Sequence, residues 1–353
     1  MRSIINKFIF AAILGTAVSV WAVLFPVYAK EVSKKELPNV IVVTLSGVRN
    51  IESIAEPHHQ YMPHLWESML KEGTLYNNLV NLNHEFHMPV VHAINTGITY
   101  TAYYSQLKKP SLFQYLIKQY NLAADQAWSV GHWYPTDCAN KTEGYQEDTF
   151  PAMLSFISFN VPPELFETLT PQEKKFCLFF SDLVAKSPGW PSWDSIGVIQ
   201  YRFFKKIIDK FHPKLVHYVM NDVESAHSDM FSRYAIALHT SDKNIFEIWS
   251  LIQTDQFYKD NTYLIVNVDH ERNTYYADHN ENSYDNPSRV WMYIFGPGVK
   301  KGAIIDRRIE HVDIFATVAG LMFLEKASTE GRFLSDCFSS QELQEKIRIP
   351  SGF

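Results

Sequence analysis

One segment constrains the fold of this chain more than any other: a mostly apolar run over residues 262–268 that ends in Asp269 and His270. The run is rich in β-branched residues, which is typical of a strand buried on both faces. In open α/β sheets the functional groups gather at the carboxyl ends of the strands. The segment therefore predicts a buried strand with an Asp-His pair at its functional edge, where both side chains are suitable metal ligands. A strand end capped by two polar residues is the alternative.

The elements before this strand alternate between strand and helix. Residues 215–220 form a second apolar run, and a long helix is predicted from about Ser228 to Asp255. The apolar residues of this helix form a stripe wide enough to pack on a sheet; they are Phe231, Ala235, Leu238, Ile245, Ile248, Trp249 and Ile252. This alternation predicts an α/β fold with a mainly parallel central sheet and helices on both faces.

Six short motifs follow one another in a recognisable order. They occupy residues 39–49, 62–73, 87–97, 261–270, 290–299 and 311–321. In this order they resemble the alkaline phosphatase superfamily, which includes sulfatases, nucleotide pyrophosphatases and cofactor-independent phosphoglycerate mutases. The resemblance runs from about Asn39 to Leu324 and implies an alkaline-phosphatase-like fold.

The resemblance also implies which residues form the site. In that superfamily a Ser, Thr or modified Cys attacks phosphorus or sulfur beside two bound metals, which neutralise charge on the transferred group. Four of the expected metal ligands are present: Asp269, His270, His227 and His279. Three expected groups are replaced, because His87 occupies the nucleophile position and Ser46 and Val223 occupy the positions of two metal-binding carboxylates.

The replaced positions leave alternatives open. Valine has no ligand atom, and a serine hydroxyl is a poor ligand unless it is deprotonated. Asp222 and Glu224 flank Val223 and are candidates to compensate for it, or else they are solvated loop carboxylates. His87 either completes an open zinc site with Asp269 and His270 or belongs to a pocket that has lost its function.

Two functions follow from the resemblance. We favour an exported protein that binds one divalent metal ion, for which zinc is the first candidate. This protein has little or no hydrolase activity of the family type. The alternative is an active metal-dependent hydrolase with a rearranged site, whose substrate is a small phosphate or sulfate ester. The net charge of −6 gives no indication of a nucleic-acid partner.

The N-terminal residues predict export. Arg2 and Lys7 precede an uncharged stretch from Phe8 to Ala29, so residues 1–29 are either a cleaved signal peptide or an N-terminal membrane anchor. Residues 30–38 then form a leader, 39–325 the α/β domain and 326–353 a C-terminal tail, with 139–191 as a candidate helical insertion. The three cysteines leave the disulfide pairing open, and none occupies the nucleophile position; they are Cys138, Cys177 and Cys337.

Overall fold

The computed structural model describes residues 36–83, 87–101, 107, 109–131, 141–155, 161–175, 177–178, 194–226, 230–272 and 289–339. Apart from Glu36, all of them belong to one structural unit, Leu37–Phe353. Residues 1–29 lie outside the described part, so their role in export stays a prediction. Among the helices of the described residues, none has the length and apolar character needed to cross a membrane.

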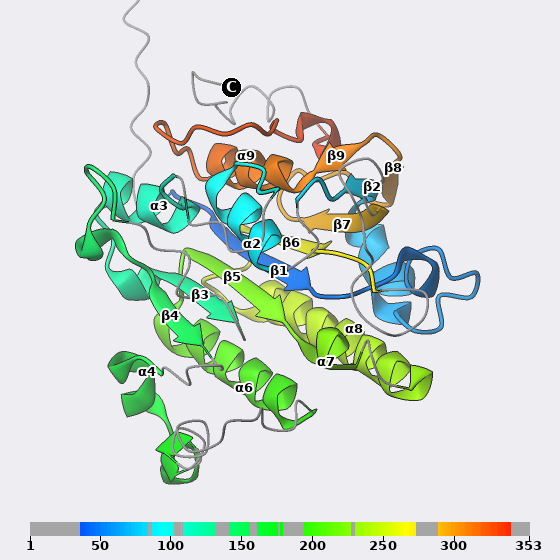
Figure 1. The fold of residues 1–353 in the computed structure, drawn as a ribbon, viewed down its shortest axis with the longest axis horizontal. Helices are drawn as coiled ribbons and strands as arrows, with labels where there is room; N and C mark the ends of the chain where they lie inside the picture. Colours follow the sequence, from blue (N-terminus) through cyan, green and yellow to red (C-terminus); the bar gives the residue numbers. More distant parts are fainter. Residues whose placement is uncertain are drawn as a thin grey trace, which may run out of the picture. The chain divides into compact units, whose positions relative to one another are not determined.

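A nine-stranded sheet forms the centre of this unit, in the order β4-β3-β5-β1-β6-β7-β2-β8, with β9 paired to β2 (Figure 1). Every residue of β1, β5 and β6 is buried, which explains why these strands show no alternation of polar and apolar residues. The strands are β1 Asn39–Leu45, β2 Gly73–Val80, β3 Ala127–Gly131, β4 Ala152–Ser155, β5 Leu215–Met220, β6 Thr262–Val268, β7 Arg289–Phe295, β8 Ala303–Ile305 and β9 Ile309–Glu310.

The sheet is mainly parallel, as predicted. Strand β7 runs antiparallel to both of its neighbours, β6 and β2, and the other strand pairs are parallel. A buried apolar run has no feature that reveals its direction, so the reversal of β7 could not be read from the sequence. The three central strands β5, β1 and β6 share one direction, and their carboxyl ends therefore meet at one edge.

Helices cover both faces of the sheet, which confirms the predicted α/β architecture (Figure 1). One group packs together on one face: α2 (His87–Thr96), α3 (Leu112–Tyr120) and α9 (His311–Leu321). The other face carries α6 (Asp194–Phe211), α7 (Asp222–Ala226) and α8 (Phe231–Thr254). Shorter helical segments include the 3-10 turns η1 (Asn50–Glu52) and η3 (Leu70–Glu72), the π-helix η2 (His64–Met69) and helix α4 (Pro163–Thr168).

Several predicted boundaries agree closely with the structure. Strands at 215–220 and 262–268 are observed at those residues, and the long helix spans Phe231–Thr254. The span 139–191, predicted as a helical insertion, also supplies edge strand β4. In the tail, Phe338 is buried and pairs with Val299. Cys177 and Cys337 are buried free thiols, and Cys138 lies outside the described residues.

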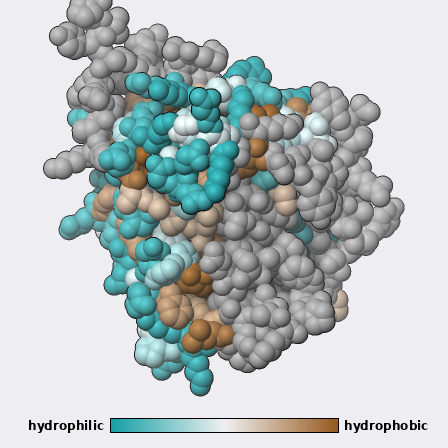
Figure 2. Space-filling model, turned by 60° about the vertical axis from the view of Figure 1, so that its left-hand side comes forward, coloured by the Kyte–Doolittle hydropathy of each residue, from teal (hydrophilic) through white to brown (hydrophobic). Residues whose placement is uncertain are grey.

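The described surface is mixed in character. In Figure 2 hydrophilic side chains dominate the upper part of one face, and hydrophobic side chains gather lower down. The large apolar side chains that are exposed come from different elements; they are Ile51, Leu178, Val198, Met230, Ile236 and Ile304. Such scattered exposure is ordinary for a globular domain.

Candidate functional site

The carboxyl edge of the sheet gathers residues that are far apart in the sequence. Ser46 follows β1, Glu224 lies in α7 directly after β5, and Asp269 with His270 follows β6. Because β5, β1 and β6 are parallel neighbours, these three loops meet. His87 joins them as the first residue of α2. These are residues that the sequence marked as candidates, and the structure brings them to one edge of the sheet.

His87 is the centre of the site. Its Nδ1 atom lies 2.8 Å from Asp269 Oδ2, and its Nε2 atom lies 2.9 Å from Glu224 Oε1. His270 Nε2 is 3.0 Å from His87 Nδ1 and 3.9 Å from Glu224 Oε2. The side chain of His87 is 5% exposed, and those of Asp269 and His270 are fully buried. The imidazole of His87 therefore lies between two carboxylates in an enclosed setting.

The charges of this cluster follow from that enclosure. Burial opposes a charge on His87, but Glu224 and Asp269 outweigh it and raise the pKa of His87 to about 10. Burial also disfavours a charged Asp269, yet His270 and the hydrogen bond from His87 hold the pKa of Asp269 below its ordinary value. The raised pKa favours the imidazolium form of His87, which donates a hydrogen bond to a carboxylate on each side.

Asp269 holds the site together through both of its oxygens. Oδ1 accepts hydrogen bonds from the backbone N–H groups of Gly47, at 3.3 Å, and His270, at 2.7 Å, while Oδ2 accepts from His87. Gly47 has a positive φ of 75°, which glycine adopts without strain. This turn aims the Gly47 N–H at the carboxylate. Asp269 therefore orients the residues around it.

Three consecutive residues of α7 point in different directions, because neighbouring positions on a helix are about 100° apart. Glu224 reaches His87, while Val223 is fully buried in the hydrophobic core. Asp222 packs against Gly197 of α6. The contact is so close that a Cβ atom added at Gly197 would lie only 2.0 Å from Asp222 Oδ1. Burial raises the pKa of Asp222 to about 6. Of the two candidates to compensate for Val223, the structure brings only Glu224 to His87.

The remaining predicted residues divide into two groups. Ser46 is buried beside this cluster, and its hydroxyl has no hydrogen-bond partner among the described residues. His227 and His279 lie outside the described residues, so their roles as ligands stay predictions.

Sequence reasoning missed the residues that support the loops of the site. Arg272 is almost fully buried and forms an ion pair with Glu52, in which Arg272 Nε lies 2.9 Å from Glu52 Oε2. Nearby, Glu271 Oε1 accepts a hydrogen bond of 2.8 Å from the backbone N–H of Asn50. Both contacts join the loop after β1 to the loop after β6. The acidic and basic residues are visible in the sequence, but only the strand order shows that they meet.

Comparison with known proteins identifies the family. The family model described as Sulfatase matches residues 131–323, which is more than half of the chain. This chain belongs to the sulfatase family. No curated protein sequence matches it.

Several solved structures share the fold of this chain. The phosphonate monoester hydrolase from Silicibacter pomeroyi has a TM-score of 0.56 at 12% identity. The match covers 84% of this chain and 76% of the hydrolase chain. The lipoteichoic acid synthase LtaP from Listeria monocytogenes has a TM-score of 0.52 at 14% identity, with 84% and 74% covered. A protein in the alkaline phosphatase superfamily from Vibrio parahaemolyticus has a TM-score of 0.52 at 12% identity, with 85% and 70% covered. At these identities the likeness establishes the fold.

The sulfatase family is metal-dependent, and the donors of this site fit a single cation. His87, Glu224 and His270 each offer a ligand atom, and these atoms lie within 4.8 Å of one another. Two imidazoles and a carboxylate are ligand types that zinc accepts, and three protein ligands are typical of an open zinc site. His270 Nδ1 lies 3.1 Å from the carbonyl oxygen of Glu271, an arrangement that leaves Nε2 facing the site. Among the described residues, Ser46 and Val223 provide no carboxylate for a second ion.

Proposed function

We propose that this sulfatase-family protein binds one divalent cation, with zinc as the first candidate. It has little or no ester hydrolase activity of the family type. The position of His87 carries the proposal. By resemblance to the superfamily His87 stands at the nucleophile position, and each of its ring nitrogens contacts a carboxylate, Asp269 on one side and Glu224 on the other. A ring held in this way serves as a cation ligand or a buried cation, and no oxygen nucleophile stands at this position.

A bound cation would be held by His87, Glu224 and His270, and it would supply positive charge at the carboxyl edge of the sheet. Asp269 would orient His87 through Nδ1, which is the usual arrangement of a carboxylate behind a metal-binding histidine. Cation binding would remove the extra proton from His87, because an imidazole binds metal in its neutral form.

The alternative is a rearranged hydrolase, and the gathering of three donor side chains around one point favours it. Histidine can act as a nucleophile in phosphoryl transfer, so His87 is its candidate nucleophile. A substrate would then be a small phosphate, phosphonate or sulfate ester, since a structurally similar protein is a phosphonate monoester hydrolase by name.

Turnover measurements separate the two functions. Zinc-loaded protein and its His270→Ala variant are incubated with 4-nitrophenyl phosphate, 4-nitrophenyl sulfate, bis(4-nitrophenyl) phosphate and 4-nitrophenyl phenylphosphonate, and release of nitrophenol is followed. We expect both proteins to give rates equal to buffer containing zinc alone. Turnover by the unmodified protein that is lost in His270→Ala would establish the rearranged hydrolase.

A further inference from the structure

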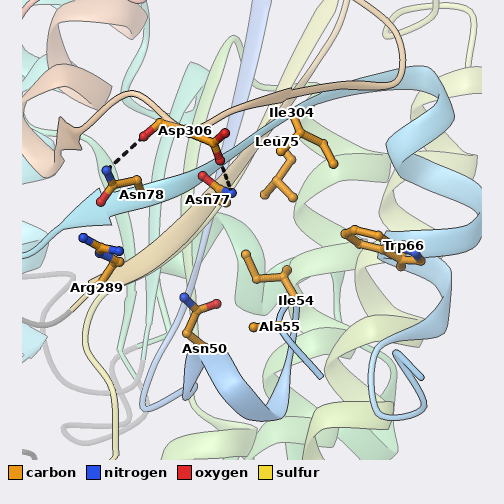
Figure 3. A pocket seen from close by; sticks show the side chains of 10 residues that line it. All are labelled: Asn50, Ile54, Ala55, Trp66, Leu75, Asn77, Asn78, Arg289, Ile304 and Asp306. Carbon is orange, nitrogen blue, oxygen red and sulfur yellow. Dashed lines mark hydrogen bonds between the residues drawn. The ribbon is translucent and has the colours of Figure 1, made fainter. Parts of the chain in front are cut away.

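A surface hollow of about 360 Å³ lies beside η1, β2 and β8 (Figure 3). Its volume falls in the range of small-molecule sites. It shares no residue with the triad of His87, Glu224 and His270. We call it the Trp66 hollow, and it is lined by Asn50, Ile54, Ala55, Trp66, Leu75, Asn77, Asn78, Arg289, Ile304 and Asp306.

The Trp66 hollow has one apolar side and one polar side. In Figure 3 Trp66, Leu75 and Ile304 lie toward one side, and Arg289, Asn78 and Asn50 toward the other. Such a division fits a ligand with an apolar face and polar edges. A sugar ring has this character, because its C–H bonds lie on the faces of the ring and its hydroxyls project from the rim.

Trp66 is held in place before any ligand binds. Its indole stacks on the ring of His59, with centroids 3.7 Å apart and planes inclined by 19°. It belongs to η2, whose first backbone N–H groups donate to the buried carboxylate of Asp242. A fixed aromatic side chain supplies a large contact area at little cost in conformational entropy.

The polar side contains groups that lack partners. The amide oxygens of Asn50 and Asn78 have no hydrogen-bond partner among the described residues, although Asn78 Nδ2 donates to the Asp306 carbonyl oxygen at 2.9 Å. An amide oxygen left in this state costs free energy, and a small rotation of the side chain would turn it toward a bound hydroxyl. Arg289 is exposed and lines the hollow, so its guanidinium is open to a ligand.

The charges and hydrogen-bonding groups together select the ligand class. Arg289 and Asp306 carry opposite charges, so the hollow has no net charge to attract an ion. A hydroxyl both donates and accepts, so one ring of hydroxyls satisfies the amide oxygens and the guanidinium together. We propose that the Trp66 hollow binds a neutral sugar unit, with an apolar face of the ring on Trp66 and its hydroxyls on Asn50, Asn78 and Arg289.

This binding site is independent of the cation site proposed above. The two sites share no lining residue, although the Asn50 N–H donates to the side chain of Glu271, the residue after His270. A variant that loses the cation should therefore keep its affinity for sugar.

Isothermal titration calorimetry on the full chain tests the proposal. The neutral ligands are cellobiose, lactose and maltose, and the charged ligands are glucose 6-phosphate and glucose 6-sulfate. We expect at least one neutral disaccharide to bind and Trp66→Ala and Asn50→Ala to weaken it at least tenfold. Trp249→Ala is the matched control, because Trp249 lines a different hollow, and His270→Ala should also retain affinity. Asn50→Ala should leave the melting temperature unchanged or higher, since it removes an amide oxygen without a partner.

Three results would overturn the inference. The first is that none of the neutral disaccharides binds at millimolar concentration, or that only the charged sugars bind. The second is that affinity is unchanged in both Trp66→Ala and Asn50→Ala although both remain folded by circular dichroism. The third is that affinity is lost in His270→Ala alone, which would place the sugar at the cation site.

Discussion

At the scale of single residues, the site depends on the direction in which each side chain points. Glu224 and Asp222 are two positions apart in one short helix, yet Glu224 contacts His87 while Asp222 packs on Gly197. The sequence suggested both as compensating ligands and had no means of choosing, because the choice depends on how α7 is rotated against the sheet. The structure makes Glu224 the candidate ligand, and this assignment can be tested directly.

The variant Glu224→Ala should bind zinc about tenfold more weakly than the unmodified protein, because the site loses both a bond and a negative charge. Asp222→Asn is the matched control, since Asp222 does not contact His87 or His270. The zinc affinity of this variant should equal that of the unmodified protein. Competition with a zinc indicator measures both dissociation constants. Equal affinities for Glu224→Ala and the unmodified protein would remove Glu224 from the site.

His217 makes the stability of the protein depend on pH. It is buried, its Nε2 lies 2.8 Å from Thr44 Oγ1 and its Nδ1 lies 2.9 Å from Asn95 Oδ1, which links β5 to β1 and α2. Burial lowers the pKa of His217 to about 3. The unfolded chain takes up this proton near pH 6.5, so the free energy of unfolding falls as the pH falls from about 6.5 toward 3.

Between pH 6.5 and 4.5 this single residue should lower the free energy of unfolding by roughly 2 kcal/mol. Urea unfolding at the two pH values measures the loss for the unmodified protein and for His217→Gln, which cannot take up the proton. Other titrating groups contribute equally to both proteins and cancel in the difference. Equal losses in the two proteins would show that His217 is not held in its neutral form.

At the scale of elements, the loops at the ends of β1 and β6 are joined by charged residues. Arg272 follows β6 and its side chain is fully buried, while its partner Glu52 lies in η1 after β1 and is 12% exposed. Arg272 also lies over the ring of Tyr234 in α8, 4.3 Å from its centroid. This ion pair thus joins η1 to the loop that carries His270, two residues before Arg272.

Glu52→Ala should lower the free energy of unfolding by about 3 to 5 kcal/mol, because it removes the carboxylate that forms an ion pair with a buried guanidinium. Glu72→Ala provides the comparison, since the ion pair of Glu72 with Lys301 is exposed and such pairs contribute about 0 to 1 kcal/mol. Chemical denaturation of both variants gives the two values. Similar losses for the two variants would show that the Arg272 ion pair does not brace the site.

At the scale of the whole molecule, the order of strands and motifs was sufficient to predict the fold class. Mostly apolar runs located β5 and β6 to the residue, because a strand buried on both faces is apolar over most of its length. The direction of β7, the rotation of α7 and the pairing of Glu52 with Arg272 depend on tertiary packing, and no local pattern encodes them.

We propose that the protein holds one cation, bound by His87, Glu224 and His270. Anomalous diffraction at the zinc edge, on crystals of the full chain grown with zinc, tests it most directly. We predict a single strong peak within bonding distance of ligand atoms from all three side chains, about 2 Å from each. Two strong peaks at the carboxyl edge of the sheet, or one peak whose ligands exclude Glu224 and His87, would contradict the account.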